Sequence, residues 1–249
     1  MNEKAHWNRI GSGYDDEIFD VFQSDRKQLL AQYFAKHANK QHIAIDFGCG
    51  TGKAFKYLSP AFKQVTGFDI SKELLKVAKS RRFENIILKQ ADLTLKNIRF
   101  EPSDFLFCCN VIMLPKAKMN RAMFRNVYQA LKPGGHAVLV VPSLESMFFT
   151  AWRLIEWNRK EGIKPDEIPA SDLAYFSASK RQIAEGIIHI DKVPTKHYTE
   201  PELRVVLAEA DLTVTATERV EYDWTTEFPE PPSWMKEPYP WDWLVEVRR

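Results

Sequence analysis

Short apolar runs alternate with amphipathic stretches over the first 143 residues, and this alternation constrains the fold more than any other feature. Five runs have the pattern of buried strands: 42–48, 64–70, 85–92, 104–112 and 136–143. Helix-like segments precede or separate them, at 24–38 with Ser24 as the expected cap, at 71–82 and at 116–131. Strands that are apolar on both faces and separated by helices are typical of a parallel sheet covered on both sides. The sequence therefore predicts a doubly wound α/β domain.

The alternation ends after Pro142. A helix-like stretch follows, and its apolar residues align on one face: Leu144, Met147, Phe148, Ala151, Leu154 and Ile155. Thr199 and Glu202 have the spacing of a capping box at the start of a further helix. The segments 212–222 and 241–249 read as strands with no helix between them, so they can pair antiparallel.

Three glycines lie within five positions where the first strand meets the next helix, in "IDFGCGTGK": Gly48, Gly50 and Gly52. Open α/β sheets bind ligands beyond the carboxyl ends of their strands. Glycine permits positive φ and lets a ligand approach the main chain closely. The spacing differs from the phosphate-binding G-x4-G-K-[ST] loop and from the G-x-G-x-x-G dinucleotide fingerprint, which disfavours a dehydrogenase.

Aspartates stand at the ends of the first three strands. Asp69 ends the second strand in "GFDIS", 21 residues beyond Gly48, where a carboxylate can accept both hydroxyls of a ribose. Asp92 ends the third strand and can accept a hydrogen bond from an exocyclic amine. Asp46 can orient the loop or take an amino group through water. Apolar neighbours can cover a purine face: Ile70, Ala91 and Leu93. The pattern describes a nucleoside that carries an amino-acid tail and no phosphate.

These motifs resemble the class I S-adenosylmethionine-dependent methyltransferases. "DFGCGTG" is similar to the glycine-rich loop of that family, "GFDIS" to its ribose-binding strand end and "ADL" to its adenine-binding turn. "CCNVIMLP" is similar to its fourth-strand segment, and "ALKPGGHAVLVVP" to its helix, turn and fifth strand. The resemblance covers roughly residues 46–143. It implies a Rossmann-like sheet of seven strands, mostly parallel with an antiparallel strand at the C-terminal end, and a helical insertion.

The resemblance also implies the cofactor, S-adenosyl-L-methionine, and its contacts. Asp69 would take the ribose hydroxyls, while Gly48 and Gly50 would let the methionine portion pass. Asn110 and Val111 would lie beside the sulfonium. The expected cofactor-binding set is Tyr14, Asp46, Gly48, Cys49, Gly50, Thr51, Gly52, Asp69, Ile70, Ala91, Asp92, Leu93, Asn110 and Val111.

We expect four parts along the chain: an N-terminal helical cap (1–40), a cofactor-binding core (41–143), an insertion that caps the acceptor (144–198) and a C-terminal segment that completes the sheet (199–249). Aromatic residues crowd the two regions expected to close over the site: Trp7, Tyr14, Phe148, Phe149, Trp152 and Trp157. Core packing and ligand contact both account for them.

The expected reaction is in-line methyl transfer to a small-molecule acceptor under the insertion, because holding the acceptor near the methyl carbon is the main catalytic task. His189 and His197 lie near that region, but neither is assigned as a catalytic base. The segment Asn110–Met113 lacks the [DNS]-P-P-[YF] motif of many enzymes that methylate nucleic-acid bases or glutamine amides. A methyltransferase for RNA or protein and a non-catalytic S-adenosylmethionine-binding regulatory module stay as alternatives. The methylated atom and the oligomeric state stay open.

Composition argues against several other classes. The formal net charge of +2 lacks the concentrated basic excess of nucleic-acid-binding domains, so we expect no nucleic-acid partner. The apolar runs fall short of the ~20 residues of a membrane span, which favours a cytoplasmic protein without a membrane partner. Cys49, Cys108 and Cys109 suit buried reduced thiols, and the sequence predicts no metal site.

Overall fold

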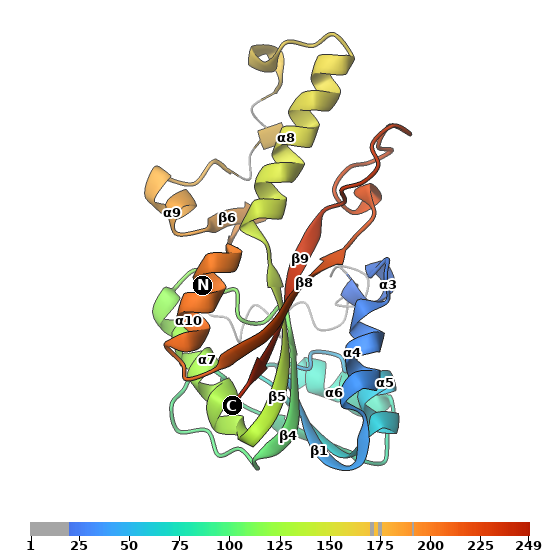
Figure 1. Ribbon diagram of the computed structural model, residues 1–249, viewed down its shortest axis with the longest axis vertical. Coiled ribbons are helices and arrows are strands. Elements are labelled where there is room, and N and C mark those ends of the chain that lie inside the picture. Colours follow the sequence, from blue (N-terminus) through green and yellow to red (C-terminus); the bar gives the residue numbers. More distant parts are fainter. Residues whose placement is uncertain (1–19, 170–171, 174–175, 191) are drawn as a thin grey trace.

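A seven-stranded sheet forms the centre of the computed structural model, which describes residues 20–169, 172–173, 176–190 and 192–249 (Figure 1). The strand order is β3-β2-β1-β4-β5-β9-β8. The strands are β1 (Asn39–Phe47), β2 (Phe62–Asp69), β3 (Ile86–Gln90), β4 (Ser103–Cys109), β5 (Leu131–Pro142), β8 (Thr213–Glu221) and β9 (Trp241–Arg248). The first five pair parallel, and β9 runs antiparallel to both β5 and β8. The predicted fold class is confirmed.

Helices cover both faces of the sheet (Figure 1). The helices on one face are α3 (Val21–Ser24), α4 (Leu29–His37), α5 (Phe55–Ala61) and α6 (Lys72–Ser80), and those on the other are α7 (Ala117–Ala130) and α10 (Glu200–Ala208). Strand β4 shows why helices pack on both faces of the sheet. Phe105 and Phe107 pack in the cluster under α4, whereas Leu106 and Cys108 pack in the cluster under α7. Burying each large apolar side chain contributes roughly 1.5–3 kcal/mol, so both faces stabilise the domain.

The first helix differs from its prediction. Ser24 does not cap a helix over 24–38, because it is the last residue of α3. The N-cap of α3 is Asp20, whose carboxylate accepts the N–H groups of Phe22 and Gln23. Helix α4 begins only at Leu29, and the buried Asp25 carboxylate accepts the N–H of Leu30 at 2.8 Å. The side-chain acceptors at the starts of these two helices are therefore Asp20 and Asp25 instead of Ser24.

Residues 144–198 extend from the carboxyl edge of the sheet (Figure 1). They form α8 (Leu144–Lys160), η1 (Pro165–Glu167), α9 (Lys180–Ala184) and a hairpin of β6 (Ile187–Ile190) with β7 (Val193–Lys196) that was not predicted. The predicted apolar face of α8 is buried only in part: Leu144 is buried and Phe148 is 46% exposed, whereas the polar Ser146 and Thr150 are buried. The helix turns its small polar side toward the sheet because the hydroxyl of Ser146 accepts the N–H of Trp241 at 2.7 Å.

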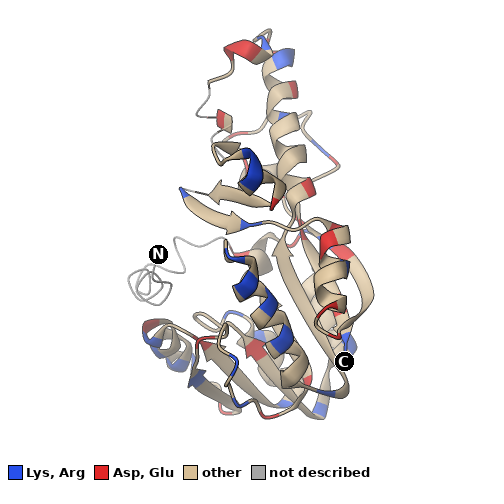
Figure 2. Ribbon diagram, turned by 90° about the vertical axis from the view of Figure 1, so that its left-hand side faces the viewer, with Lys and Arg blue, Asp and Glu red and all other residues tan. Residues whose placement is uncertain are grey.

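Helix α10 starts as predicted at Thr199, whose hydroxyl accepts the N–H of Glu202. The reciprocal half of the capping box is replaced by an ion pair, since the Glu202 carboxylate lies 2.7 Å from the Lys196 ammonium. In the view of Figure 2, α7 carries Lys and Arg but no Asp or Glu, whereas both signs of charge occur elsewhere on the ribbon. Within the described parts of the chain, every helix is too short or too polar to cross a bilayer.

Candidate cofactor and acceptor site

The glycine-rich loop joins β1 to α5 at the carboxyl edge of the sheet. Gly48, Gly50 and Gly52 have φ values of 85°, 52° and 78°, a region that favours glycine. The N–H groups of Gly48 and Cys49 both donate to the carbonyl of Phe68 at 2.8 Å, which fastens the loop to β2. The main-chain conformation alone therefore explains why glycines occupy these positions. Because they have no side chains, a ligand can also approach the main chain of the loop.

Gly48 lies directly against Val111, which follows β4. A Cβ atom on Gly48 would lie 2.3 Å from Cγ2 of Val111 and 2.8 Å from Cγ1. Real Cβ atoms do not approach so closely, so only glycine fits between β1 and β4 here. The structure thus brings together two residues that the sequence placed in one site.

Asp69, at the end of β2, is buried and fixed by main-chain donors. Its Oδ2 accepts the N–H of Gly50 at 2.9 Å, and its Oδ1 accepts the N–H of Ser71 at 2.8 Å. Burial raises the pKa of the carboxyl, and these donors oppose that rise. A carboxylate offers about four acceptor positions, so Asp69 is not saturated by its main-chain donors.

Asp46, in β1, is the most isolated charged group of the site. It is 3% exposed, and its Oδ2 has no hydrogen-bond partner among the described residues. Burial, together with the charge of Asp69, raises its pKa from 3.8 to about 8. A cationic group placed beside Asp46 would reverse that shift and supply the missing partner.

The turn after β3 adds the third aspartate. Oδ1 of Asp92 accepts the N–H of Thr94 at 3.0 Å and its hydroxyl at 2.6 Å, and neither bond uses Oδ2. The N–H of Ala91 donates to the carbonyl of Asp69, which holds this turn beside the end of β2. Leu93 is buried there.

Main-chain contacts hold two more predicted residues at this edge. The carbonyl of Ile70 accepts a hydrogen bond from Gln90 at 2.9 Å, and the carbonyl of buried Thr51 accepts one from Arg81 at 2.6 Å. Two predicted residues, Tyr14 and Trp7, lie outside the described residues.

Asn110, directly after β4, has a φ of 52° and links the loop side of the site to β9. Its Nδ2 donates to Oδ2 of Asp242 at 3.1 Å. Its Oδ1 is buried and has no partner within the described chain. The side chain is therefore anchored at one end and keeps an unused acceptor at the other.

Asp242 is the centre of an acidic cluster that the sequence did not predict. The hydroxyl of Tyr222 donates to the same Oδ2 at 2.8 Å. Burial raises the pKa of Asp242, and burial together with the Asp242 charge raises the pKa of Glu227 to about 7. The register pairs Asp242 with Pro142, so the start of antiparallel β9 reaches the carboxyl edge of β5. The available sequence signal was Asp242 itself, one of two acidic residues inside "WDWLVEV".

The two histidines near the acceptor region lie apart from this cluster. His197 is buried, its Nδ1 lies 3.1 Å from the carbonyl of Thr195, and burial lowers its pKa to about 4. The Nδ1 of His189 lies 3.4 Å from the hydroxyl of Ser177. These contacts agree with the sequence analysis, which assigned neither histidine as a catalytic base.

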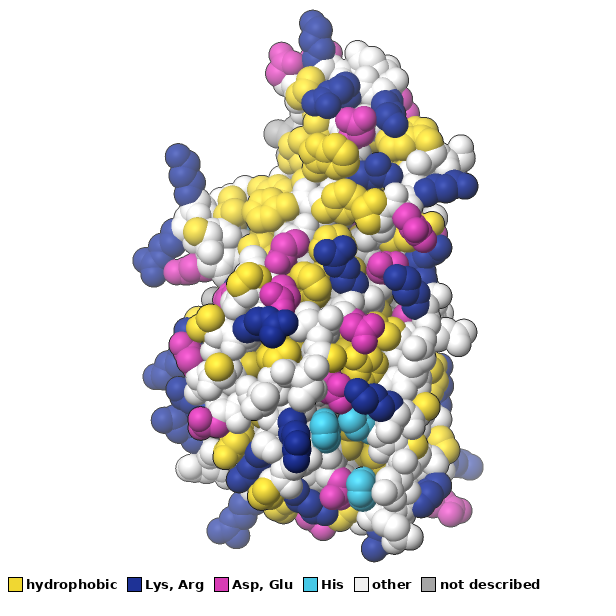
Figure 3. All heavy atoms as spheres, in the orientation of Figure 1, with side chains coloured by type: hydrophobic (Ala, Val, Ile, Leu, Met, Phe, Trp, Pro, Cys, Tyr) yellow, Lys and Arg dark blue, Asp and Glu magenta, His cyan; other side chains and the backbone are white. Residues whose placement is uncertain are grey.

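The aromatic residues of α8 divide into two groups. Phe149 packs against Trp224 and Trp241, with ring centroids 5.6 and 6.2 Å apart. Phe148 and Trp152 are 46% and 51% exposed. Hydrophobic side chains gather on the upper part of the surface, in the region of α8 (yellow, Figure 3). Core packing explains the first group, and the second is available to a ligand.

Comparisons with known proteins find similar methyltransferases. Residues 44–135 match the family model described as a methyltransferase domain. The demethylmenaquinone methyltransferase of Tropheryma whipplei is 31% identical over 138 residues, which are 53% of this chain and 56% of that protein. The chain thus spans about half the length of this curated relative.

Solved structures share the fold. An S-adenosylmethionine-dependent methyltransferase from Mesorhizobium loti has a TM-score of 0.63 at 18% identity, covering 92% of this chain and 100% of its own. The N-methyltransferase NodS from Bradyrhizobium japonicum, in complex with S-adenosyl-L-homocysteine, has a TM-score of 0.60 at 15% identity, covering 100% and 99%. The predicted cofactor, S-adenosylmethionine, agrees with the match to a methyltransferase domain and with these structures. Residues 44–135 are similar to a methyltransferase domain, and the chain has the fold of the class I S-adenosylmethionine-dependent methyltransferases.

Proposed function

We propose that this methyltransferase acts on a small-molecule acceptor bound between the end of β4 and the start of β9. The observation that carries the proposal is the hydrogen-bonded pair Asn110 and Asp242, which adjoins the glycine loop through Val111. S-adenosylmethionine supplies, when bound, a methyl group activated by its sulfonium. The work left to the protein is to orient two molecules and to take up a proton from the acceptor where one is released.

The residues of the loop side fit the cofactor. Asp69 keeps acceptor capacity for the ribose hydroxyls after binding its main-chain donors. The unpartnered Oδ2 of Asp46 suits a cationic amino group, reached directly or through water. The main chain at Gly48 lets the methionine portion pass, and Asp92 with Leu93 borders the adenine.

Asp242 would orient the acceptor and accept its proton. Tyr222 and Asn110 both donate to Oδ2, so Oδ1 receives neither of these bonds and is left for a hydroxyl or amine of the acceptor. Glu227 lies near enough to raise the total negative charge of the site. Two carboxylates in a half-buried position favour an acceptor that brings a hydrogen-bond donor or a positive charge.

A small acceptor agrees with the name of the similar demethylmenaquinone methyltransferase, because demethylmenaquinone is a small molecule. NodS is named as an N-methyltransferase. The exposed rings of Phe148 and Trp152 offer apolar surface for an acceptor body. The four-part division of the chain and the cytoplasmic location predicted from the sequence stay predictions.

Labelled methyl transfer against a metabolite library tests the proposal, with Asp69→Ala as the background control. Transfer to a low-molecular-weight compound by the wild type but not by Asp69→Ala would support it. Label that appears in macromolecules of a cell extract, and disappears after nuclease or protease treatment, would instead support RNA or protein as the acceptor. Tight S-adenosylmethionine binding without transfer to either class would favour a regulatory module.

A further inference from the structure

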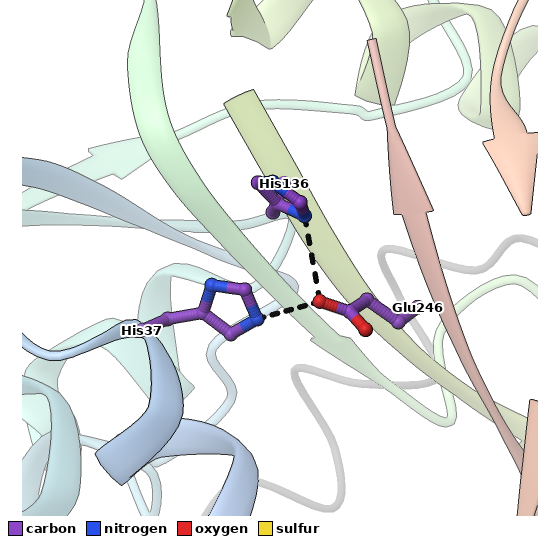
Figure 4. A group of neighbouring side chains, drawn as sticks. All are labelled: His37, His136 and Glu246. Carbon is purple, nitrogen blue, oxygen red and sulfur yellow. Dashed lines mark hydrogen bonds and ion pairs between the residues drawn. The ribbon is translucent and has the colours of Figure 1, made fainter. Parts of the chain in front are cut away.

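Three side chains from distant parts of the chain converge on the face of the sheet covered by α4 (Figure 4). His37 ends α4, His136 lies in β5 and Glu246 lies in β9. Nε2 of His37 is 2.7 Å from Oε1 of Glu246, and Nδ1 of His136 is 3.4 Å from the same oxygen. One ligand atom from each residue lies within 4.8 Å of the other two.

This cluster is separate from the cofactor and acceptor site. His136 precedes Pro142, at the carboxyl edge of β5, by six residues. At about 3.3 Å per residue, that places it roughly 20 Å from the edge where the glycine loop lies. Histidine side chains gather on the corresponding lower part of the surface (cyan, Figure 3). The proposed methyl transfer uses none of these groups.

Two features of the cluster point to a bound ion. The Glu246 side chain is 3% exposed, and its two oxygens face different partners: Oε2 lies 2.7 Å from the Lys36 ammonium, while Oε1 faces both imidazole rings. Nδ1 of His136 is buried and forms no hydrogen bond with any described residue. A buried nitrogen without a hydrogen-bond partner requires an explanation, and a bound ion is a common explanation.

The donor set identifies the class of ion. Two imidazole nitrogens and one carboxylate oxygen suit Zn²⁺, with metal–ligand distances of about 2.0–2.2 Å. Tetrahedral ligands at those distances are about 3.3–3.5 Å apart. The His136–Glu246 separation already has this value, whereas the His37–Glu246 separation has to open by about 0.6–0.8 Å.

Neighbouring groups are compatible with a dication. Lys36 bonds the outer oxygen of Glu246, as partners of metal-binding carboxylates commonly do. Glu218, which accepts the hydroxyl of Tyr33 at 2.7 Å, adds a second negative charge nearby.

We propose that His37, His136 and Glu246 bind one Zn²⁺ ion, with water completing the coordination. The ion would fasten α4 to β5 and β9. Because the three ligands span most of the chain, this cross-link closes long loops and would stabilise the folded state. Its role is structural, and it does not depend on the proposed acceptor.

Calorimetric titration of Zn²⁺ into the untagged, EDTA-treated full chain tests the site. We expect one ion per chain, micromolar or tighter affinity, and a Tm raised by several degrees at saturating Zn²⁺. Co²⁺ in place of Zn²⁺ should give the intense visible absorption of a four- or five-coordinate ion. Absence of saturable binding below about 100 μM, or a six-coordinate Co²⁺ spectrum, would overturn the proposal.

Variants assign the ligands. His136→Gln and Glu246→Gln should each weaken Zn²⁺ binding by roughly tenfold or more. The control is His42→Gln, because His42 lies in β1, contacts Asn39 and is outside the cluster. An equal loss in His42→Gln would contradict the assignment. If a ligand variant fails to fold, the wild-type titration and the Co²⁺ spectrum still show whether the protein binds the ion.

Discussion

Asn110 and Asp242, 132 residues apart in the chain, are joined by a hydrogen bond of 3.1 Å from Nδ2 to Oδ2. Asn110 follows β4, Asp242 is the second residue of β9, and β5 lies between these strands. The bond therefore crosses the carboxyl edge of the sheet. It makes the predicted cofactor-side residue and the proposed acceptor-side carboxylate parts of one polar network.

Asp242→Asn tests the proton-accepting role, because it keeps the size of the side chain and removes its charge. We expect methyl transfer to fall by about 10²-fold or more, with S-adenosylmethionine affinity changed by less than about threefold. Burial raises the pKa of Asp242, so the wild type should lose activity on acidification at a higher pH than an ordinary aspartate would allow. The variant should lose that limb of the pH profile. Equal losses of binding and turnover would show a purely structural role.

The ribose assignment rests on Asp69. Asp69→Ala should weaken S-adenosylmethionine binding by about 2–4 kcal/mol through lost charge-assisted hydrogen bonds, measured by calorimetry. Asp69→Asn, which keeps one acceptor oxygen for Gly50 or Ser71, should lose less. Asp104→Asn is the matched control, since Asp104 accepts from Ile43 and Lys132 away from the loop. Unchanged affinity in Asp69→Ala would reject the assignment.

The positions of the main strands along the chain and the glycine loop were predictable because their signals are local. Buried strands appear as apolar runs, and a loop that needs positive φ appears as glycines. Asp242 was not predictable in the same way, because its position depends on the antiparallel register of β5 with β9. The same holds for α8, whose buried side is set by the bond between Ser146 and Trp241 rather than by its apolar stripe.

Gly48 provides a test of close packing at the loop. Gly48→Ala should destabilise the protein and abolish measurable cofactor binding, because the added Cβ meets Val111 and the φ of 85° is strained. Val111→Ala should partly rescue it by removing the two γ carbons. Gly134→Ala carries a similar φ of 80° but meets only Arg248 at 3.5 Å, so it isolates the cost of φ alone. Thermal unfolding of the three single variants and the double variant measures the coupling; strict additivity would contradict a direct clash.

Asp46 should couple cofactor binding to proton release. Its pKa of about 8 in the free protein means that the carboxyl is mostly protonated at pH 7, and a cationic ligand lowers that pKa. Binding of S-adenosylmethionine at pH 7 should therefore release a fraction of a proton, detected as a binding enthalpy that varies with the ionisation enthalpy of the buffer.

The same shift predicts the stability of the free protein. The folded-state pKa exceeds the ordinary value of 3.8, so the folded chain holds more protons than the unfolded chain between about pH 4 and pH 8. The contribution of Asp46 to the free energy of unfolding is thus largest below pH 4 and falls as pH rises to about 8. Asp46→Asn should remove both this slope and the buffer-dependent enthalpy while leaving the protein folded. A buffer-independent enthalpy in the wild type would mean that the cofactor does not place positive charge beside Asp46.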